Sequence, residues 1–460
     1  MPTRREILSQ TATSLAFAGL SAMAGRRAWA EEPAPARAGF PDLIKDPAGI
    51  LDLPPGFSYR VISKAGETMV DGLRVPAMFD GMAAFPGPNG AVILVRNHEM
   101  AHEPNSAGAF GDDRALLSTV DRSRLYDVGA NPNGPLPLGG TTTVVYDPAA
   151  GKTLRQWLSL GGTLRNCAGG PTPWGTWLTC EETVQTAGGP YAKDHGWVFE
   201  VPVTAEPVLT PAVPLTGLGR WYHEAAAVDP RDGAVILTED RADGCLYRFV
   251  PKKAGDLRSP GRLQALVVTG KPGCDTRNWQ HQEWAVGETR PVTWVDIPIT
   301  DRGDEMRTTI PDAARFARGE GLWVASDGML FCTTSGGKAV ATDKRGFGVG
   351  KGQVWKLAHG GAALTLYIQP DEANILENCD NITVSPNGHL ILCEDSCAPA
   401  IDAVQHIVGV TPKGACYRLA RNALNSAEFA GACFSPDGAI LFVNIQTPGL
   451  TLAITGPWPK

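Results

Sequence analysis

After its first thirty residues the sequence has no apolar run that could cross a membrane, and it lacks several common enzyme motifs. A membrane-spanning helix needs about 20 apolar residues, so we expect no stable membrane insertion. The absence of Gly-x-x-x-x-Gly-Lys-Ser/Thr excludes a P-loop nucleoside triphosphatase, and the absence of Gly-x-Ser-x-Gly argues against a serine hydrolase. Basic residues are in deficit, with 41 Lys and Arg against 48 Asp and Glu, so nucleic acid is not an expected partner.

The ten cysteines include no Cys-x-x-Cys pair, which argues against a structural zinc site. The shortest spacing is that of Cys393 and Cys397. Several of the others lie in strand-like apolar runs, where a small buried thiol is the ordinary state. We therefore expect at most one or two disulfides.

The first thirty residues have the layout of a Tat export signal. Arg4 and Arg5 precede a weakly hydrophobic stretch over about residues 11–25, and Ala28-Trp29-Ala30 forms a cleavage site. The alternative is a short amphipathic helix. We expect residues 31–460 to form one monomeric catalytic domain, exported by the Tat translocase and located in the periplasm or outside the cell.

Turn-forming residues are abundant, because 53 Gly and 37 Pro occur without a collagen-like period. Six segments share one design, an apolar strand that ends in polar or acidic residues, and most of them follow an Asn-Gly or Asp-Gly turn. They span residues 91–99, 176–182, 234–241, 329–335, 389–396 and 439–446. This repeat predicts an all-β protein, a β-propeller with six blades rather than five or seven. The alternatives are a β-sandwich with long insertions or two separate barrels. We expect residues 101–140 and 252–287 to form long loops or caps over one face.

Acidic residues stand where these strands end, and equivalent strand ends of a propeller meet around one channel mouth. The acidic residues at or near these ends are Glu99, Glu181 or Glu182, Glu224, Glu239 with Asp240, Glu320, and Glu394 with Asp395. Converging carboxylates repel one another unless cations or protons neutralise them, and oxygen-rich clusters suit hard cations such as Ca²⁺. Cys167, close to Arg165, would add transition-metal character as a thiolate. The alternatives are paired or solvated carboxylates and an inert buried thiol.

The sequence resembles the PhoX-type alkaline phosphatase family from residue 49 to residue 458. Seven motifs carry the resemblance in this order: Arg96-Asn-His-Glu99, Asn166-Cys-Ala-Gly-Gly170, Cys180-Glu-Glu182, His223-Glu224, Thr238-Glu-Asp-Arg241, Arg318-Gly-Glu-Gly321 and Cys393-Glu-Asp395. The resemblance implies a six-bladed propeller that holds an oxo-bridged cluster of Fe³⁺ and Ca²⁺. It also implies hydrolysis of phosphomonoesters, with small phosphate esters as substrates.

The resemblance also implies roles for individual residues. Cys167, Glu181 and Glu320 match iron ligands. Four further carboxylates are candidate ligands of iron or calcium, namely Glu224, Glu239, Glu394 and Asp380. Arg318 matches the arginine that contacts phosphate, and Arg165 and Lys338 are further candidates for that role. The chain is shorter than the long members of the family, and its loops leave the natural substrate open.

Two other classes of function remain open at this point. One is a calcium-dependent lactonase or esterase on a similar propeller, which needs one buried cation and no thiolate. The other is a non-enzymatic binding propeller, which needs no converging carboxylates. Metal analysis and an aryl phosphate assay separate the three.

Overall fold

The computed structural model describes residues 40–101, 108–111, 114–131, 134–279, 281–298, 300–334, 352–370, 376–395 and 404–458. The predicted export signal, Lys338 and Cys397 lie outside these ranges. Within them the chain forms strands and short 3-10 turns, and no α-helix. The turns are η2 (Pro88–Gly90), η3 (Ala115–Thr119), η4 (Arg122–Arg124), η5 (Thr216–Leu218) and η6 (Gly303–Thr309). No helix among the described residues is long and apolar enough to span a bilayer.

The strands form five antiparallel hydrogen-bonded sheets in the described part of the chain. One four-stranded sheet has β3 (Phe79–Pro86), β4 (Val92–His98), β5 (Gly139–Asp147) and β6 (Lys152–Thr163). The next has β7 (Asn166–Pro171), β8 (Thr176–Glu181) and β9 (Val198–Pro202). The largest joins nine strands in the order β10 (His223–Val228), β11 (Val235–Glu239), β12 (Leu246–Pro251), β13 (Gly261–Val268), β14 (Thr289–Asp296), β18 (Ala363–Ile368), β17 (Gln353–Ala358), β16 (Gly328–Thr333) and β15 (Gly319–Ala325).

Both remaining sheets combine strands from the two ends of the described chain. One has the order β1 (Leu51–Asp52), β22 (Cys416–Asn422), β21 (His406–Val410), β20 (Leu390–Glu394) and β19 (Cys379–Val384). The other has the order β2 (Ser58–Lys64), β25 (Leu450–Thr455), β24 (Ile440–Ile445) and β23 (Phe429–Phe434). Because β2 pairs with β25, the start of the chain completes the sheet that the end of the chain builds.

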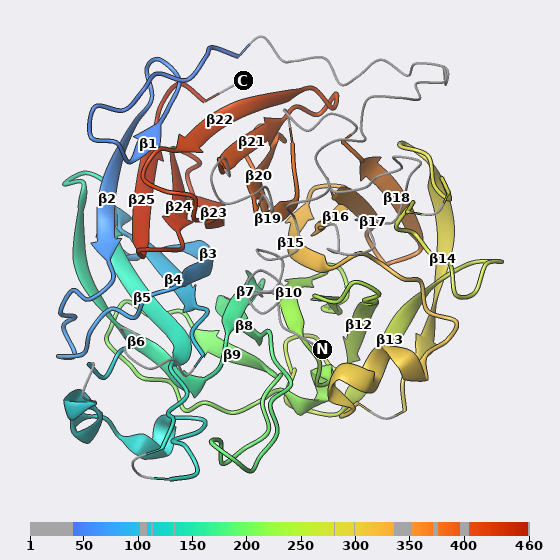
Figure 1. Ribbon diagram of the computed structural model, residues 1–460, viewed down its shortest axis with the longest axis horizontal. Coiled ribbons are helices and arrows are strands. Elements are labelled where there is room, and N and C mark those ends of the chain that lie inside the picture. The colour runs from blue at the N-terminus through green and yellow to red at the C-terminus, as the bar shows by residue number, and fades with distance from the viewer. Residues whose placement is uncertain are drawn as a thin grey trace, which may run out of the picture.

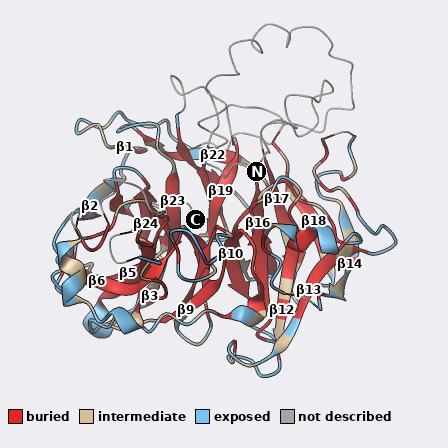
Figure 2. Cartoon of the chain, turned by 60° about the horizontal axis from the view of Figure 1, so that its bottom comes forward, coloured by how far each residue is buried: buried red, intermediate tan, exposed pale blue. Residues whose placement is uncertain are grey.

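The sheets stand around a common centre, toward which one strand of each hairpin faces (Figure 1). These inner strands are β3, β7, β10, β15, β19 and β23. Each of them contacts the next, and β23 contacts β3, so the ring is closed. Figure 2 shows that the strands are mostly buried and that exposed residues gather on the outer strands and turns. The predicted all-β, propeller-like fold is therefore confirmed.

The predicted count of six separate blades differs from the sheets observed. Two groups of strands, which we call fans, are joined in one nine-stranded sheet: β10 to β14 and β15 to β18. They are joined because Thr289–Pro291 of β14 pair with residues 363–365 of β18. The prediction that residues 252–287 form a loop is wrong in part, because β13 lies within them. The buried residues of β13 favour a strand, whereas the turn-forming residues around it had indicated a loop. The nine described cysteines are all free and buried.

One irregularity recurs in all six hairpins that begin with an inner strand. A register shift, or β-bulge, follows the first one or two residues of that strand. A bulge turns side chains out of the regular alternation. It also brings neighbouring inner strands close together: a Cβ on Gly81 would lie 2.6 Å from Cα of Ala168, and one on Gly321 would lie 2.6 Å from the carbonyl oxygen of Asp380. Glycine at these two positions permits the close approach.

Candidate metal centre

The recurrent bulge places acidic or thiol side chains at equivalent positions of the inner strands. The second residue of each of the first five inner strands carries such a group: Asp80, Cys167, Glu224, Glu320 and Asp380. The sixth inner strand has Ala430 there. All five side chains are buried, which puts one ring of potential ligands around the axis.

A second ring comes from the residue that follows the neighbouring strand of each hairpin. Its members are Glu99, Glu182, Asp240, Thr334, Asp395 and Gln446. Each backbone N–H donates to the carbonyl oxygen of the residue just before the inner strand, over distances of 2.9 to 3.2 Å. These acceptors are Met78, Arg165, Tyr222, Arg318, Asn378 and Glu428. The same backbone pattern therefore positions three side chains in every hairpin. They belong to the residue before the inner strand, the second residue of that strand and the residue after the neighbouring strand.

Seven members of the two rings form a continuous chain of potential ligands, which we call the acidic centre. Three overlapping groups have ligand atoms within 4.8 Å of one another: Asp80, Glu99 and Cys167; Cys167, Glu182 and Glu224; Glu224, Asp240 and Glu320. All seven residues are buried, and Cys167 and Glu224 are each shared by two groups. A fourth group, the side cluster, consists of Asp380, Asp395 and Glu428.

Cys167 is the only sulfur donor in these groups. Its Sγ donates to Oε1 of Glu224 over 2.9 Å and lies 3.7 Å from Oδ2 of Asp80. Burial first, and then the carboxylates of Asp80 and Glu224, raise the pKa of the Cys167 thiol well above its usual value. A cation that binds Sγ would have to displace this proton.

Glu182 shows that the carboxylates crowd one another. Burial, followed by the charges of Asp240 and Glu99, raises the pKa of Glu182 well above its usual value. Its Oε2 is buried and receives no hydrogen bond from the described residues. Buried carboxylates in this situation stay protonated or are neutralised by cations, so the donor set fits metal ions.

Two arginines reach the acidic centre from equivalent positions, Arg165 before β7 and Arg318 before β15. Nε and Nη2 of Arg318 donate to the two carboxylate oxygens of Asp240 over 2.7 and 2.9 Å, and Nη2 lies 3.1 Å from Glu320. Nη1 of Arg165 lies 3.1 Å from Oε1 of Glu99. Among the described residues, the ion pairs of the six carboxylates of the centre involve these two arginines, and the remaining oxygens offer ligand positions that suit cations.

Three of the predicted metal ligands, Glu181, Glu239 and Glu394, lie outside the acidic centre. Each is the last residue of its strand, one position before a member of the second ring. Because side chains alternate along a strand, each of these three glutamates points to the opposite side from the second-ring residue that follows it. Glu239 accepts from the N–H of Cys245 over 3.0 Å and from the hydroxyl of Tyr247 over 2.9 Å.

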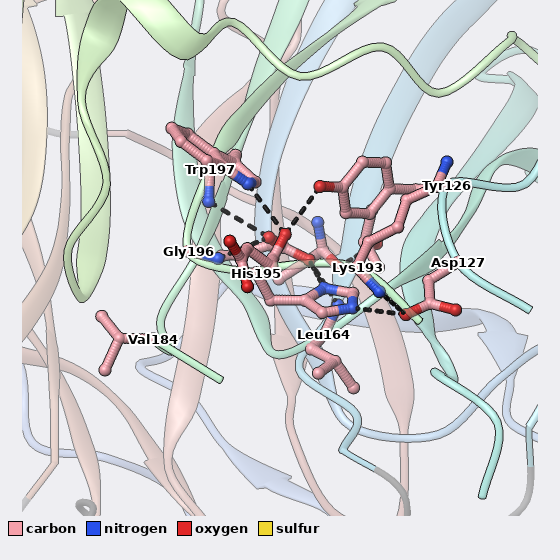
Figure 3. A network of polar contacts seen from close by, with 12 residues as sticks. Tyr126, Asp127, Leu164, Val184, Lys193, His195, Gly196 and Trp197 are labelled. Atoms are coloured by element: carbon pink, nitrogen blue, oxygen red, sulfur yellow. Dashed lines mark hydrogen bonds and ion pairs between the residues drawn. The ribbon is translucent and has the colours of Figure 1, made fainter. Parts of the chain in front are cut away.

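Glu181 lies in the most extensive of these networks. Its carboxylate accepts from Nδ1 of His195 over 2.6 Å, and Nε2 of His195 lies 3.2 Å from Oδ2 of Asp127 (Figure 3). Burial disfavours the charged imidazole, but Glu181 and Asp127 outweigh it and raise the pKa of His195 to about 9. The Glu181 carboxylate is thus matched by a buried positive charge.

The structure brings together Cys167, Glu224 and Glu320 with Arg165 and Arg318, all of which the sequence had singled out. It places Asp380 in the side cluster, and Lys338 lies outside the described residues.

Sequence reasoning missed Asp80. The signal that could have found it is the spacing of the repeat. Asp80-Gly81 precedes the first of the six repeated segments (residues 91–99), just as Glu320-Gly321 precedes the fourth (residues 329–335). Sequence reasoning also missed Glu428, which no motif marks, and whose position depends on the last hairpin.

Fold and site together define a class, that of propeller-like proteins with a buried acidic centre and arginines that face it. The chain belongs to the alkaline phosphatase PhoX family, whose model matches residues 38–449. It is therefore a phosphoric monoester hydrolase, and the resemblance drawn from the motifs is confirmed.

The fold is similar to that of a solved structure. PhoX of Pseudomonas fluorescens, in complex with vanadate, a transition state analogue, is 18% identical, with a TM-score of 0.66 over 91% of this chain and 98% of that one. A gluconolactonase from Xanthomonas campestris is 11% identical, with a TM-score of 0.40 over 88% of this chain and 99% of that one. The second likeness is too low to support an argument. Comparison with curated protein sequences gives no match.

Proposed function

We propose that the protein is an exported phosphatase that hydrolyses phosphomonoesters at a cluster of iron and calcium ions in the acidic centre. The observation that carries this proposal is the set of three overlapping ligand groups, buried, linked through Cys167 and Glu224, and flanked by two arginines. A lactonase with one cation has no need for so many linked carboxylates or for a thiol among them.

The chemistry of the donors suggests how the ions are shared out. Cys167, Glu182, Glu224 and Glu320 would hold iron, since a thiolate among carboxylates suits Fe³⁺. Carboxylate oxygens without a thiolate suit Ca²⁺, so the remaining carboxylates, Asp80, Glu99, Asp240 and the side cluster, would hold calcium. Glu181, Glu239 and Glu394 would support the backbone beside these ligands. This division favours Glu182 over Glu181, Asp240 over Glu239, and Asp395 over Glu394.

The arginines would bind and orient the substrate. When bound, the metal ions would polarise the phosphate and lower the pKa of a coordinated water. Arg318 is held by a two-pronged pair with Asp240, so its guanidinium is fixed before substrate arrives. Arg165 and Arg318 would donate to the non-bridging oxygens, where negative charge has to be stabilised in phosphoryl transfer. Enclosure of the centre limits the access of bulk water and strengthens these contacts.

We also propose that the ring consists of six blades. Residues 31–460 would form one catalytic domain. Six hairpins carry the same bulge and the same backbone hydrogen bond. Among the described residues, β14 and β18 pair at three positions, against four to six positions between the paired strands within each fan. That link is short beside the pairing inside each fan.

Export by the Tat translocase, to the periplasm or the medium, is proposed from residues 1–30. Replacing both Arg4 and Arg5 by Lys should leave the protein in the cytoplasm, as followed by cell fractionation. Efficient export of this variant would show that another route is used.

The direct test is metal analysis of the natively exported protein together with an aryl phosphate assay. We expect iron, more than one calcium per chain, and phosphatase turnover that a chelator abolishes. Calcium alone with lactone hydrolysis would instead support a lactonase. Turnover of neither substrate by the metal-replete protein would support a binding propeller.

A further inference from the structure

Glu181 is a fully buried carboxylate that the proposed chemistry does not use directly. It accepts hydrogen bonds from the N–H groups of Leu164, Gly196 and Trp197 over 2.8, 2.8 and 3.1 Å, and from Nδ1 of His195 over 2.6 Å. Its two oxygens therefore tie together the end of β8, the residues before β7 and the residues before β9.

Both chain segments that Glu181 holds lead directly into the acidic centre. Leu164 is followed by Arg165, and Glu181 is followed by Glu182. The two neighbours are themselves joined, because the N–H of Glu182 donates to the carbonyl oxygen of Arg165 over 2.9 Å. Arg165 has a φ of 49°, in the left-handed region that non-glycine residues uncommonly adopt.

Asp127 extends the network outward from His195. In addition to His195, its Oδ2 accepts from the N–H groups of Ala192 and Lys193 over 2.8 and 3.0 Å (Figure 3). The imidazole is therefore fixed on both sides by carboxylates and cannot turn without breaking a contact. Since all three side chains are buried, a broken contact would leave polar groups without water.

In the fifth hairpin a buried glutamate supports the backbone in the same way, but the residue that it supports is not an arginine. Glu394, the equivalent of Glu181, accepts from the N–H of Glu377 over 2.9 Å and from Nδ1 of His406 over 3.1 Å. The residue after Glu377 is Asn378, which has a φ of 50° and stands where Arg165 stands in the second hairpin. The two hairpins thus share the support and differ in the residue it supports.

We propose that Glu181, His195 and Asp127 are positioning residues that hold Arg165 in the orientation in which it binds the phosphate group. The role rests on the proposed function, which places the phosphate against Arg165. It predicts that loss of the support weakens phosphate binding specifically, because a guanidinium that can turn away makes fewer two-pronged contacts.

The test measures the Ki of inorganic phosphate, KM and kcat for an aryl phosphate, and metal content. For Glu181→Gln we expect Ki and KM to rise about tenfold, the loss of roughly one charge-assisted hydrogen bond. We expect unchanged iron and calcium and a much smaller change in kcat. The matched control is Glu394→Gln, which should lower the melting temperature by a similar amount and leave the Ki of phosphate within about twofold.

A double-mutant cycle separates positioning from general support. In an Arg165→Ala background, Glu181→Gln should raise Ki no further, because the residue that it positions is already absent. If Glu181→Gln does not fold, Asp127→Asn carries the same cycle with a smaller effect, since Glu181 and its backbone contacts remain.

Additive effects on Ki, or an equal rise of Ki in Glu394→Gln, would overturn the positioning role and leave the proposed function standing. Wild-type protein that holds its metals but neither binds phosphate nor turns over the ester would overturn both.

Discussion

Cys167 owes its surroundings to the acids of three hairpins, not to its own sequence neighbours. Its pKa is raised by burial and by Asp80 and Glu224, so a metal ion of the proposed cluster would have to displace the thiol proton. A serine hydroxyl in the same place cannot ionise at neutral pH and is a poor ligand for iron. Under the proposed function, this side chain would therefore decide which metal the centre retains.

We predict that Cys167→Ser loses iron and at least about a hundredfold in kcat, while the fold is kept. Elemental analysis, aryl phosphate turnover and circular dichroism measure the three properties. The control is Cys180→Ser, a buried thiol in β8 outside the ligand groups, which should cost stability and keep iron. Full activity in metal-replete Cys167→Ser would refute the assignment of the ligand.

His195 makes stability depend on pH in a defined window. Its pKa is raised from 6.5 to about 9 in the folded protein, so folding tightens proton binding. The stabilisation is complete below about pH 6.5 and is lost as pH rises through about 9. Its full size is of the order of 3 kcal/mol.

We therefore expect the free energy of unfolding of the wild type to exceed that of His195→Gln most at pH 6. The difference should shrink steadily up to pH 10. Urea denaturation across this range measures it. A difference that stays constant, or that grows with pH, would contradict the assignment of a buried charged imidazole.

At the scale of the element, the β-bulge is the device that makes the site. It shifts the second residue of each inner strand toward the axis and leaves the rest of the strand in ordinary alternation. Gly431 shows what the bulge demands in the last hairpin. It has a φ of +62°, and a Cβ there would lie 2.4 Å from the carbonyl oxygen of Asp80 and 2.7 Å from Nδ2 of Asn444.

Gly431→Ala should destabilise the protein by about 3 kcal/mol, since the strain of a left-handed alanine adds to overpacking. It should also weaken metal binding, because Asp80 is displaced. Gly66→Ala is the control, with a φ of +83° and nothing within 4 Å of the added Cβ, and should cost about 1 kcal/mol. Equal losses in the two variants, measured by urea denaturation, would show that the close approach has no energetic weight.

At the scale of the whole molecule, ring closure and charge oppose each other. The ring is closed by β2 on β25 and by contacts of β23 with β3, which bring the carboxylates together. In the described part of the chain, six carboxylates of the acidic centre lie close together, and Arg165 and Arg318 pair with some of them. Without cations, part of the energy of closure is spent on keeping carboxylates close or protonated.

Chelation should therefore lower the melting temperature, and calcium should restore part of the loss. A cation present at a hundred times its dissociation constant stabilises the folded state by about 2.7 kcal/mol. Differential scanning calorimetry before and after EDTA treatment measures the effect. An unchanged melting temperature in protein shown to be metal-free would mean that the acidic centre is stable without cations.

The sequence by itself determined the class of fold and much of the chemistry of the centre. Asn-Gly and Asp-Gly turns between apolar segments are local signals, and Cys167, Glu224, Glu320 and Arg318 stand in motifs that can be read along the chain. The tertiary structure alone decided which of two adjacent acids faces the axis. Side chains alternate along a strand, so the choice between Glu181 and Glu182 depends on the register of pairing and on a bulge. It also decided the position of Asp80, because the folded chain brings this residue beside Cys167, 87 positions away in sequence.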